Sequence, residues 1–80
     1  MRIDKFLKVS RIIKRRTVAN DACDNELVTV NGRQVKASYD VKVGDVITIT
    51  FGQRKATVRV LDVSEHVLKK DASLLYEVIE

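Results

Sequence analysis

The spacing of apolar residues changes at Leu27, and this change constrains the fold more than any other feature of the 80-residue sequence. Before Leu27, apolar side chains recur three and four residues apart, which is typical of amphipathic helices. After it, apolar and polar residues alternate in short segments, which is typical of half-buried strands. The sequence therefore predicts an α+β fold, in which two N-terminal helices pack on a small, mostly antiparallel sheet of four or five strands.

Two helices are predicted in the first quarter of the chain. The first is indicated by one helical stripe, which consists of Ile3, Phe6, Leu7, Ser10 and Ile13. Asp4 is expected to cap its start, and Thr17 is expected to be the N-cap of a second helix that continues to Cys23. The break between the helices is then expected at residues 14–16. Three bases would stand there beside a helix N-terminus, whose free N–H groups can bind phosphate.

The strongest strand signal is the dipeptide Asn31-Gly32, because these residues readily adopt the positive φ values of a tight hairpin turn. A second turn is predicted at residues 43–45. The polar segment 64–73 is expected to form a loop or a short helical turn. The predicted strands are residues 27–30, 33–35, 46–51, 55–63 and 74–79, although the last of these would also suit a helix.

Length and composition favour one small soluble domain. Apolar residues make up 45% of the chain and charged residues 32%, and there is no proline. Residues 1–80 are expected to form a single domain, with a motif core at about 1–50 and C-terminal strands at 55–80. No apolar run exceeds three residues, and the first residues lead into charge, so neither a membrane span nor a signal peptide is expected. We expect a cytoplasmic protein.

Positive charge is concentrated in the first twenty residues. Residues 21–80 hold eight bases and ten acids and sum to −2. Residues 1–20 sum to +6, because Asp4 is their one acid and their bases are Arg2, Lys5, Lys8, Arg11, Lys14, Arg15 and Arg16. A solvated helix face would usually carry acids that relieve such repulsion. On a helical wheel Lys8, Arg11 and Arg15 share one face, so the pattern favours binding of a polyanion.

No residue pattern indicates catalysis, a metal or a cofactor. His66 is the only histidine and lies in a polar segment, so we expect it to face solvent. Cys23 is the only cysteine and is expected to be a small buried apolar residue. The sequence predicts a binding protein that is not an enzyme and uses no cofactor.

Aromatic residues are few. Phe6 and Phe51 are expected in the core, which leaves Tyr39 and Tyr76 as weak candidates for stacking on bases. A structured RNA that is bound through its backbone fits this composition better than a single strand that is bound through stacked bases.

Four short motifs mark the first fifty residues. They are Arg2-Ile3-Asp4-Lys5-Phe6-Leu7, Arg16-Thr17, Val28-Thr29-Val30-Asn31-Gly32 and Val43-Gly44-Asp45. Their order and spacing resemble those of the ribosomal protein S-four-type RNA-binding domain, also called the alpha-L RNA-binding motif. The length and the first eleven residues are most similar to the free-standing RqcP proteins of bacterial ribosome-associated quality control.

The resemblance implies particular partners and a particular role. The implied partners are large-subunit rRNA, peptidyl-tRNA and an RqcH-like tailing factor on the ribosome, and the implied role is to support C-terminal alanine tailing of stalled nascent chains. A monomer is expected. Asp4 is expected to orient its neighbours rather than to touch phosphate. The residues expected to face RNA are Arg2, Lys5, Lys8, Arg11, Lys14, Arg15, Arg16, Thr17, Asn31, Gly32 and Lys36.

The chain departs from the family pattern at residues 25–27. Glu26 and Leu27 stand where many members have glycine and a basic residue, so no binding role is expected there. Asn25 is expected to adopt the left-handed turn conformation instead.

Three other functions remain open on the sequence. One is a heat-shock-type factor that recycles large subunits with nascent chains. The second is a helix-turn-helix-like DNA binder, although the strand-rich second half argues against it. The third is an accessory domain for a modification enzyme that another chain supplies.

Overall fold

The computed structural model describes residues 1–79 and has the predicted α+β architecture. The helices are α1 (Ile3–Val9), α2 (Arg16–Asp24) and a 3-10 helix, η1 (Lys69–Leu75). The strands are β1 (Val28–Val30), β2 (Arg33–Gln34), β3 (Val46–Phe51), β4 (Arg54–Val60) and β5 (Tyr76–Val78). They form one five-stranded sheet in the order β2-β1-β3-β4-β5, and every neighbouring pair is antiparallel.

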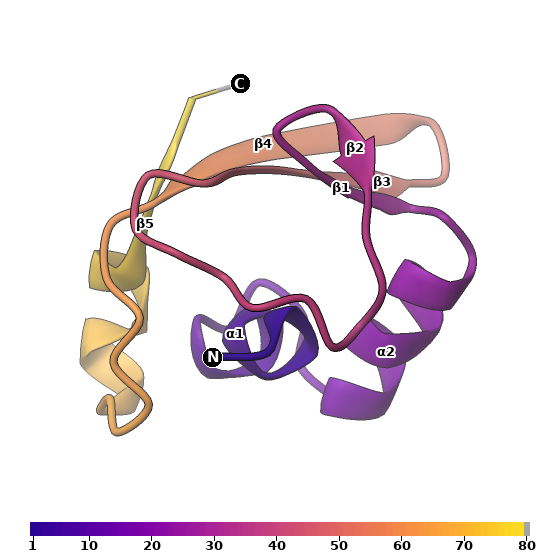
Figure 1. Ribbon diagram of the computed structural model, residues 1–80. Coiled ribbons are helices and arrows are strands. Elements are labelled where there is room, and N and C mark those ends of the chain that lie inside the picture. Colours follow the sequence, from indigo (N-terminus) through magenta and orange to yellow (C-terminus); the bar gives the residue numbers. More distant parts are fainter. Residues whose placement is uncertain (80) are drawn as a thin grey trace.

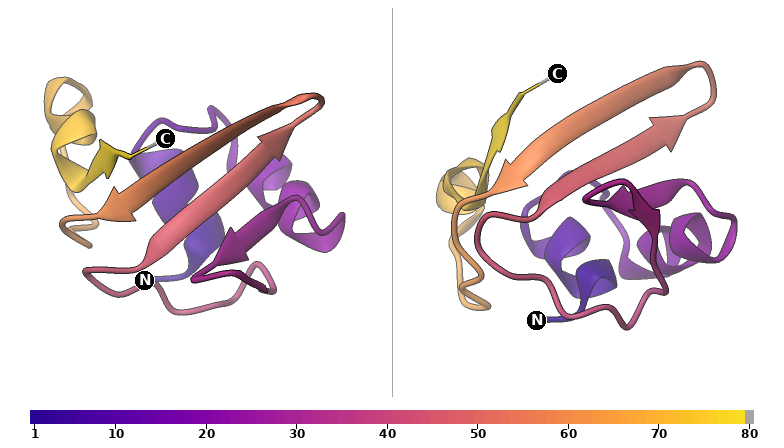
Figure 2. Two further views of the ribbon diagram at one scale, coloured as in Figure 1. Left: turned by 90° about the horizontal axis from the view of Figure 1, so that it is seen from above. Right: turned by 45° about the horizontal axis from the view of Figure 1, so that its top comes forward.

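The molecule has two layers. Figure 1 shows the sheet above α1 and α2, and Figure 2 shows η1 beyond the β4–β5 edge. Alternation along the strands turns Val28, Ile47 and Ile49 toward the helices, where they are fully buried. On the other face the Thr48 and Thr57 hydroxyls lie 3.2 Å apart. The helices therefore cover one face of the sheet and leave a polar face open.

The N-terminus is held by the segment between β2 and β3. The Ile3 amide donates to the Tyr39 carbonyl oxygen at 2.8 Å, and the Val41 amide donates to the Met1 carbonyl oxygen at 2.8 Å. The N-terminal ammonium donates to Asp40 Oδ1 at 2.6 Å. These contacts fix where α1 begins, and no local sequence signal had assigned this task to residues 36–42.

The Asn31-Gly32 turn is confirmed, with φ of 53° and 84° at the two residues. Asn31 does more than turn the chain, because its Nδ2 donates to Asp45 Oδ1 at 3.2 Å and its Oδ1 accepts from the Val46 amide at 3.0 Å. Asp45 also accepts from the Tyr39 hydroxyl at 3.0 Å. The hairpin is thereby tied to the second turn.

The end of α1 differs from the prediction. α1 ends at Val9 and not at Ile13, because Arg11 adopts a left-handed φ of 63°. Ile13 is still buried, since the chain turns back and its amide donates to the Leu7 carbonyl oxygen at 3.0 Å. The apolar stripe thus continues beyond the end of the helix, because Ile13 is buried although it is not helical.

The predicted caps were also wrong. Arg2 and Arg15 occupy the N-cap positions, and neither makes a side-chain cap hydrogen bond. Asp4 lies in the first turn of α1, where it is buried, and Thr17 lies in the first turn of α2. Both polar side chains lie two residues after the N-cap, within the first turn of their helix.

Two expectations at the edges of the sheet were wrong. Glu26, with φ of 63°, adopts the left-handed conformation, while Asn25 has φ of −90°. Phe51 is 45% exposed instead of buried, because it lies at the end of β3 beside the turn to Arg54. Phe6 is fully buried, as predicted.

The C-terminal third is less regular than predicted. β4 ends at Val60 rather than at residue 63, and the polar segment leads into η1, which buries Ala72 and Leu75. The final strand is confirmed as β5, although it is shorter than residues 74–79. No helix within residues 1–79 is long and apolar enough to cross a membrane.

Candidate nucleic-acid interface

Two arginines from separate helical segments meet at one buried carboxylate. Arg2 holds Asp4 with two hydrogen bonds of 3.2 Å, from Nε to Oδ1 and from Nη2 to Oδ2. Arg16, in the first turn of α2, places its Nη2 3.4 Å from Asp4 Oδ1. The Asp4 side chain is 3% exposed, whereas those of Arg2 and Arg16 are 50% and 46% exposed. Asp4 therefore fixes one side of each guanidinium and leaves the other side in solvent.

Further donors complete the surroundings of Asp4. Asn20 Nδ2 donates to Oδ2 at 3.3 Å, and the Lys5 amide donates to Oδ1 at 2.8 Å. Burial alone would raise the pKa of Asp4, but the hydrogen bonds from Asn20, Arg2, Arg16 and the Lys5 amide outweigh it and lower that pKa below 3.8. The carboxylate is charged at neutral pH, as the predicted orienting role of Asp4 requires.

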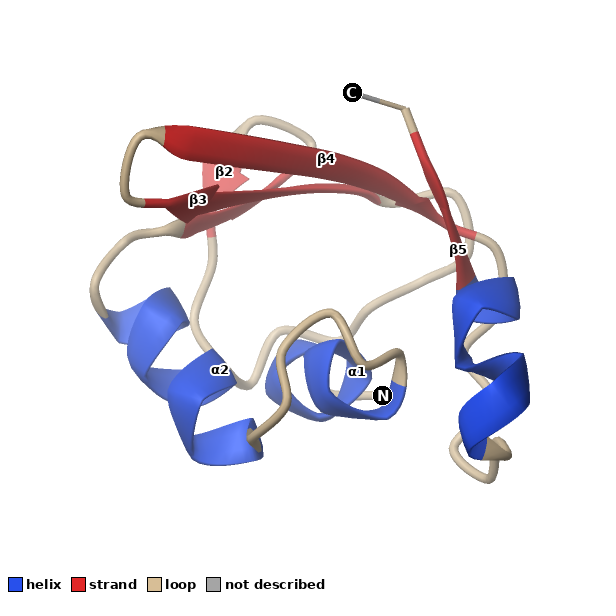
Figure 3. Cartoon of the chain, turned by 180° about the vertical axis from the view of Figure 1, so that it is seen from behind, coloured by secondary structure: helices blue, strands red, loops and turns tan. Residues whose placement is uncertain are grey.

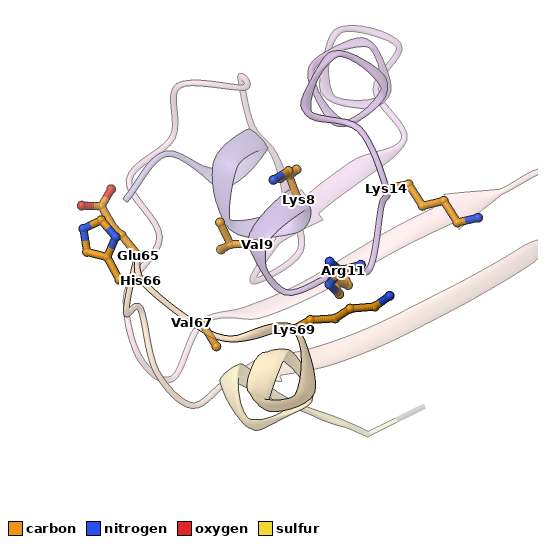
Figure 4. A pocket seen from close by; sticks show the side chains of 8 residues that line it. All are labelled: Lys8, Val9, Arg11, Lys14, Glu65, His66, Val67 and Lys69. Atoms are coloured by element: carbon orange, nitrogen blue, oxygen red, sulfur yellow. The ribbon is translucent and has the colours of Figure 1, made fainter.

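A second basic cluster surrounds an open cavity behind α1. Figure 4 shows its lining, and its volume is about 530 Å³. Lys8, Arg11 and Lys14 from α1 and the following connection are exposed around it. Within residues 1–79 none of the three takes part in an ion pair. Their positive charge is available to an anion. The cavity is lined by Lys8, Val9, Arg11, Lys14, Glu65, His66, Val67 and Lys69.

Lys5 has an acidic partner, as Arg2 and Arg16 do, but its partner comes from a distant segment of the chain. Its Nζ lies 2.8 Å from Glu65 Oε1. This hydrogen bond and the charge of Lys5 lower the pKa of Glu65. Lys5 therefore joins α1 to the segment that precedes η1.

Arg15 and Thr17 are exposed at the start of α2. Thr17 and Arg16 line a shallow depression of about 290 Å³ with Asp4 and Asn20. The predicted shared helix face of Lys8, Arg11 and Arg15 was wrong, because α1 ends at Val9 and Arg15 adopts an extended conformation before α2. Charge gathers here around a turn instead of along a helix.

The hairpin residues lie apart from this turn. Asn31, Gly32 and Lys36 are exposed, but both polar atoms of the Asn31 side chain are engaged with residues 45 and 46. Segment 31–45 faces the viewer in Figure 1, whereas the connection between α1 and α2 faces the viewer in the reverse view of Figure 3. The predicted binding residues therefore occupy different sides of the molecule.

Sequence reasoning missed the contribution of residues 65–69 to the cavity. Lys69 lies among its basic lining residues although 55 positions separate it from Lys14. The available signal was the pair Lys69-Lys70 in a polar segment. The net charge of −2 over residues 21–80 concealed it, because a sum over sequence does not show which bases the fold brings together.

The residues that could have suggested chemistry have structural roles or face solvent. Cys23 is 4% exposed, and burial, aided by Asp4 and Asp24, raises its pKa to about 11, so its thiol is protonated at neutral pH. His66 is exposed, as expected. Across residues 1–79 no three metal-binding side chains gather at one place.

Two helices on one face of a small antiparallel sheet, with exposed bases around their connection, define this chain as a small α+β domain with a basic surface. Residues 1–47 match the S4 domain family. The chain is 55% identical over 78 residues to the RQC P-site tRNA stabilizing factor of Halalkalibacterium halodurans, an alignment that covers 98% of this chain and 89% of the relative. It is 48% identical to the protein of the same name from Bacillus subtilis, covering 100% of this chain and 93% of the relative.

A solved structure gives the same fold. Vibrio cholerae Heat Shock Protein 15, described as trimeric, superposes with a TM-score of 0.89 at 29% identity, covering 98% of this chain and 80% of the other. The chain belongs to the S4 domain family and, within it, groups with the RQC P-site tRNA stabilizing factors.

Proposed function

We propose that this protein is a non-catalytic factor that binds large-subunit rRNA and peptidyl-tRNA during ribosome-associated quality control. The observation that carries the proposal is the set of exposed bases Lys8, Arg11 and Lys14 around one open cavity, which make no ion pair within residues 1–79. Whole-length similarity to proteins named as P-site tRNA stabilizing factors supports the ribosomal setting. That setting makes the protein cytoplasmic.

The arginine pair on Asp4 supports binding to phosphate. A guanidinium that is fixed on one side loses less freedom when its remaining donors grip a phosphate. Arg2 and Arg16 are each held in this way and remain about half exposed. If about six phosphates are contacted, affinity falls with roughly the fifth power of salt concentration by the relation for duplex DNA, and less steeply for single strands.

Sedimentation with large ribosomal subunits tests the proposal. Arg16→Ala is expected to abolish co-sedimentation while the fold survives, because Asp4 keeps its bonds from Arg2, Asn20 and the Lys5 amide. Arg54→Ala is the matched control, since Arg54 is an exposed arginine at the distal β3–β4 turn. Wild-type protein that fails to sediment with large subunits would refute the proposed function.

The finer proposal is that binding supports alanine tailing by an RqcH-like partner. Stalled nascent chains should then lose their alanine tails when the protein is removed from cells. The alternative is a heat-shock-type factor that recycles large subunits carrying nascent chains. The 38% identity to the Heat shock protein 15 homolog of Aeromonas salmonicida favours keeping this alternative, although that relative is covered over only 61% of its length. Tails that persist without the protein would favour the alternative.

We propose that the protein acts as a monomer on RNA and not on duplex DNA. Copies that met at the basic cavity would repel one another. Sedimentation equilibrium tests the monomer. Competition between ribosomal RNA and duplex DNA at fixed salt tests the preference for RNA, and equal competition would contradict it.

A further inference from the structure

The cavity behind α1 has two walls that come from distant parts of the chain. Lys8, Arg11 and Lys14 form one wall, and residues 65–69 form the other. Figure 4 shows Lys69 extending below Arg11 toward Lys14, with Glu65 and His66 at the opposite end. The family match ends at residue 47, so the second wall lies outside it.

Two contacts hold the second wall in place. The 2.8 Å ion pair between Lys5 and Glu65 connects it to α1. Val67 is partly buried and packs against the hydrophobic core. The wall is therefore positioned by the folded protein before any ligand arrives.

The charge of the cavity lining is strongly one-sided. Lys8, Arg11, Lys14 and Lys69 are basic, and Glu65 is the one acidic residue in the lining. Glu65 already has Lys5 as its partner, so its negative charge is largely offset. Lys69 makes no ion pair within the described part of the chain. An anion that enters the cavity meets cations on both sides.

We propose that this cavity is a cleft for the phosphate backbone of RNA, with Lys69 as a binding residue on its second wall. The proposal rests on the proposed RNA-binding function and extends its site to the C-terminal third of the chain. The cleft is open rather than enclosed, and its lining holds no phenylalanine, tyrosine or tryptophan; its one ring is the His66 imidazole, at the end away from Lys69. It therefore suits a continuous backbone better than a stacked base or a free nucleotide.

The salt dependence of binding to purified large-subunit rRNA tests the cleft. Dissociation constants measured between about 50 and 200 mM salt give a log–log slope that counts phosphate contacts. Lys69→Gln is expected to weaken affinity about fivefold at the lower salt and to reduce the slope by about 0.7 to 0.9. Lys70→Gln is the matched control, because Lys70 is its exposed neighbour and does not line the cavity. It should match the wild type.

The outcomes separate this proposal from the function on which it rests. Equal slopes and affinities for Lys69→Gln, Lys70→Gln and wild type would overturn the cleft while wild-type sedimentation with large subunits upheld the function. Binding to rRNA that depends on Lys69, without sedimentation on large subunits, would support the cleft and refute the function. Wild-type protein that does not bind rRNA at all would overturn both.

Discussion

The connection between α1 and α2 and the Asn31-Gly32 hairpin were both predicted to face RNA, yet they use their polar side chains differently. At the connection and the last turn of α1 before it, Lys8, Arg11 and Lys14 are exposed without acidic partners among residues 1–79. At the hairpin, both polar atoms of the Asn31 side chain are bound to residues 45 and 46. The bases near the connection can therefore bind a ligand, whereas the Asn31 side chain is already used to hold the hairpin to the next turn.

The difference teaches how to interpret such motifs. A turn dipeptide is demanded by backbone geometry, and its side chain is then close enough to bond the neighbouring turn. Unpaired bases have no such structural use, and their mutual repulsion costs stability. Excess charge therefore points to a partner, whereas Asn31-Gly32 is explained by the fold itself.

In the comparison of these two regions, the largest expected effect comes from neutralising the bases of α1 and of the connection that line the cavity. The triple variant Lys8→Gln, Arg11→Gln and Lys14→Gln should weaken rRNA binding by about a hundredfold, if each contact contributes about 1 kcal/mol. The log–log salt slope should fall by about two to three. The melting temperature should stay within a few degrees of that of the wild type, because these side chains make no ion pair in the described structure. If the triple variant unfolded as well as losing rRNA binding, these bases would serve the fold as Asn31 does, and the contrast between the two regions would be wrong.

Asn31→Ala should show the opposite behaviour. Loss of both hydrogen bonds, together with a left-handed alanine at φ of 53°, should cost about 2–3 kcal/mol of unfolding free energy. The affinity of the folded protein for rRNA should hardly change. Asn31→Gly separates the two causes, since glycine tolerates the turn but lacks the carboxamide. Its unfolding free energy, measured in urea, should lie between those of wild type and Asn31→Ala.

Much of the fold could be predicted from sequence because local rules decide it. The alternation in residues 46–51 and the Asn31-Gly32 turn are local signals, and both predictions were confirmed. The N-terminal pairing with Tyr39 and Val41, and the meeting of Lys69 with Arg11, depend on contacts between segments far apart in the chain. No local pattern encodes those contacts, so half of the cavity was missed.

The end of α1 was also beyond local rules. Ile13 continues the helical stripe, but an arginine adopts the left-handed conformation that usually falls to glycine. Burial of Ile13 on the returning chain offsets that strain. Periodicity alone cannot distinguish a longer helix from a helix that turns back and buries the same residue.

Arg11→Gly should separate stability from binding at this turn. Arginine at φ of 63° is strained by about 1 kcal/mol, so glycine should leave the protein equally stable or up to about 1 kcal/mol more stable. Affinity for rRNA should nevertheless fall several-fold, because a cation leaves the cavity lining. Arg11→Ala is the control, since it loses the same charge and keeps the strain. If Arg11→Gly bound rRNA as tightly as the wild type, Arg11 would not be part of the binding surface.

The smallest expected effect is a change of stability at low pH. It tests whether the charge of Asp4 helps to hold Arg2 and Arg16 in place. The pKa of Asp4 is lowered below its unfolded value of 3.8, so its stabilising contribution is present above that pH and is lost as the pH falls through the folded pKa. The difference in unfolding free energy between wild type and Asp4→Asn should therefore shrink below about pH 4. Asp40 and Glu65, whose pKa values are also lowered, are present in both proteins and cancel. Chemical denaturation at a series of pH values measures this difference. A difference that stays constant down to pH 2 would mean that Arg2 and Arg16 gain nothing from the charge of Asp4, and that their positions on the surface are set by packing alone.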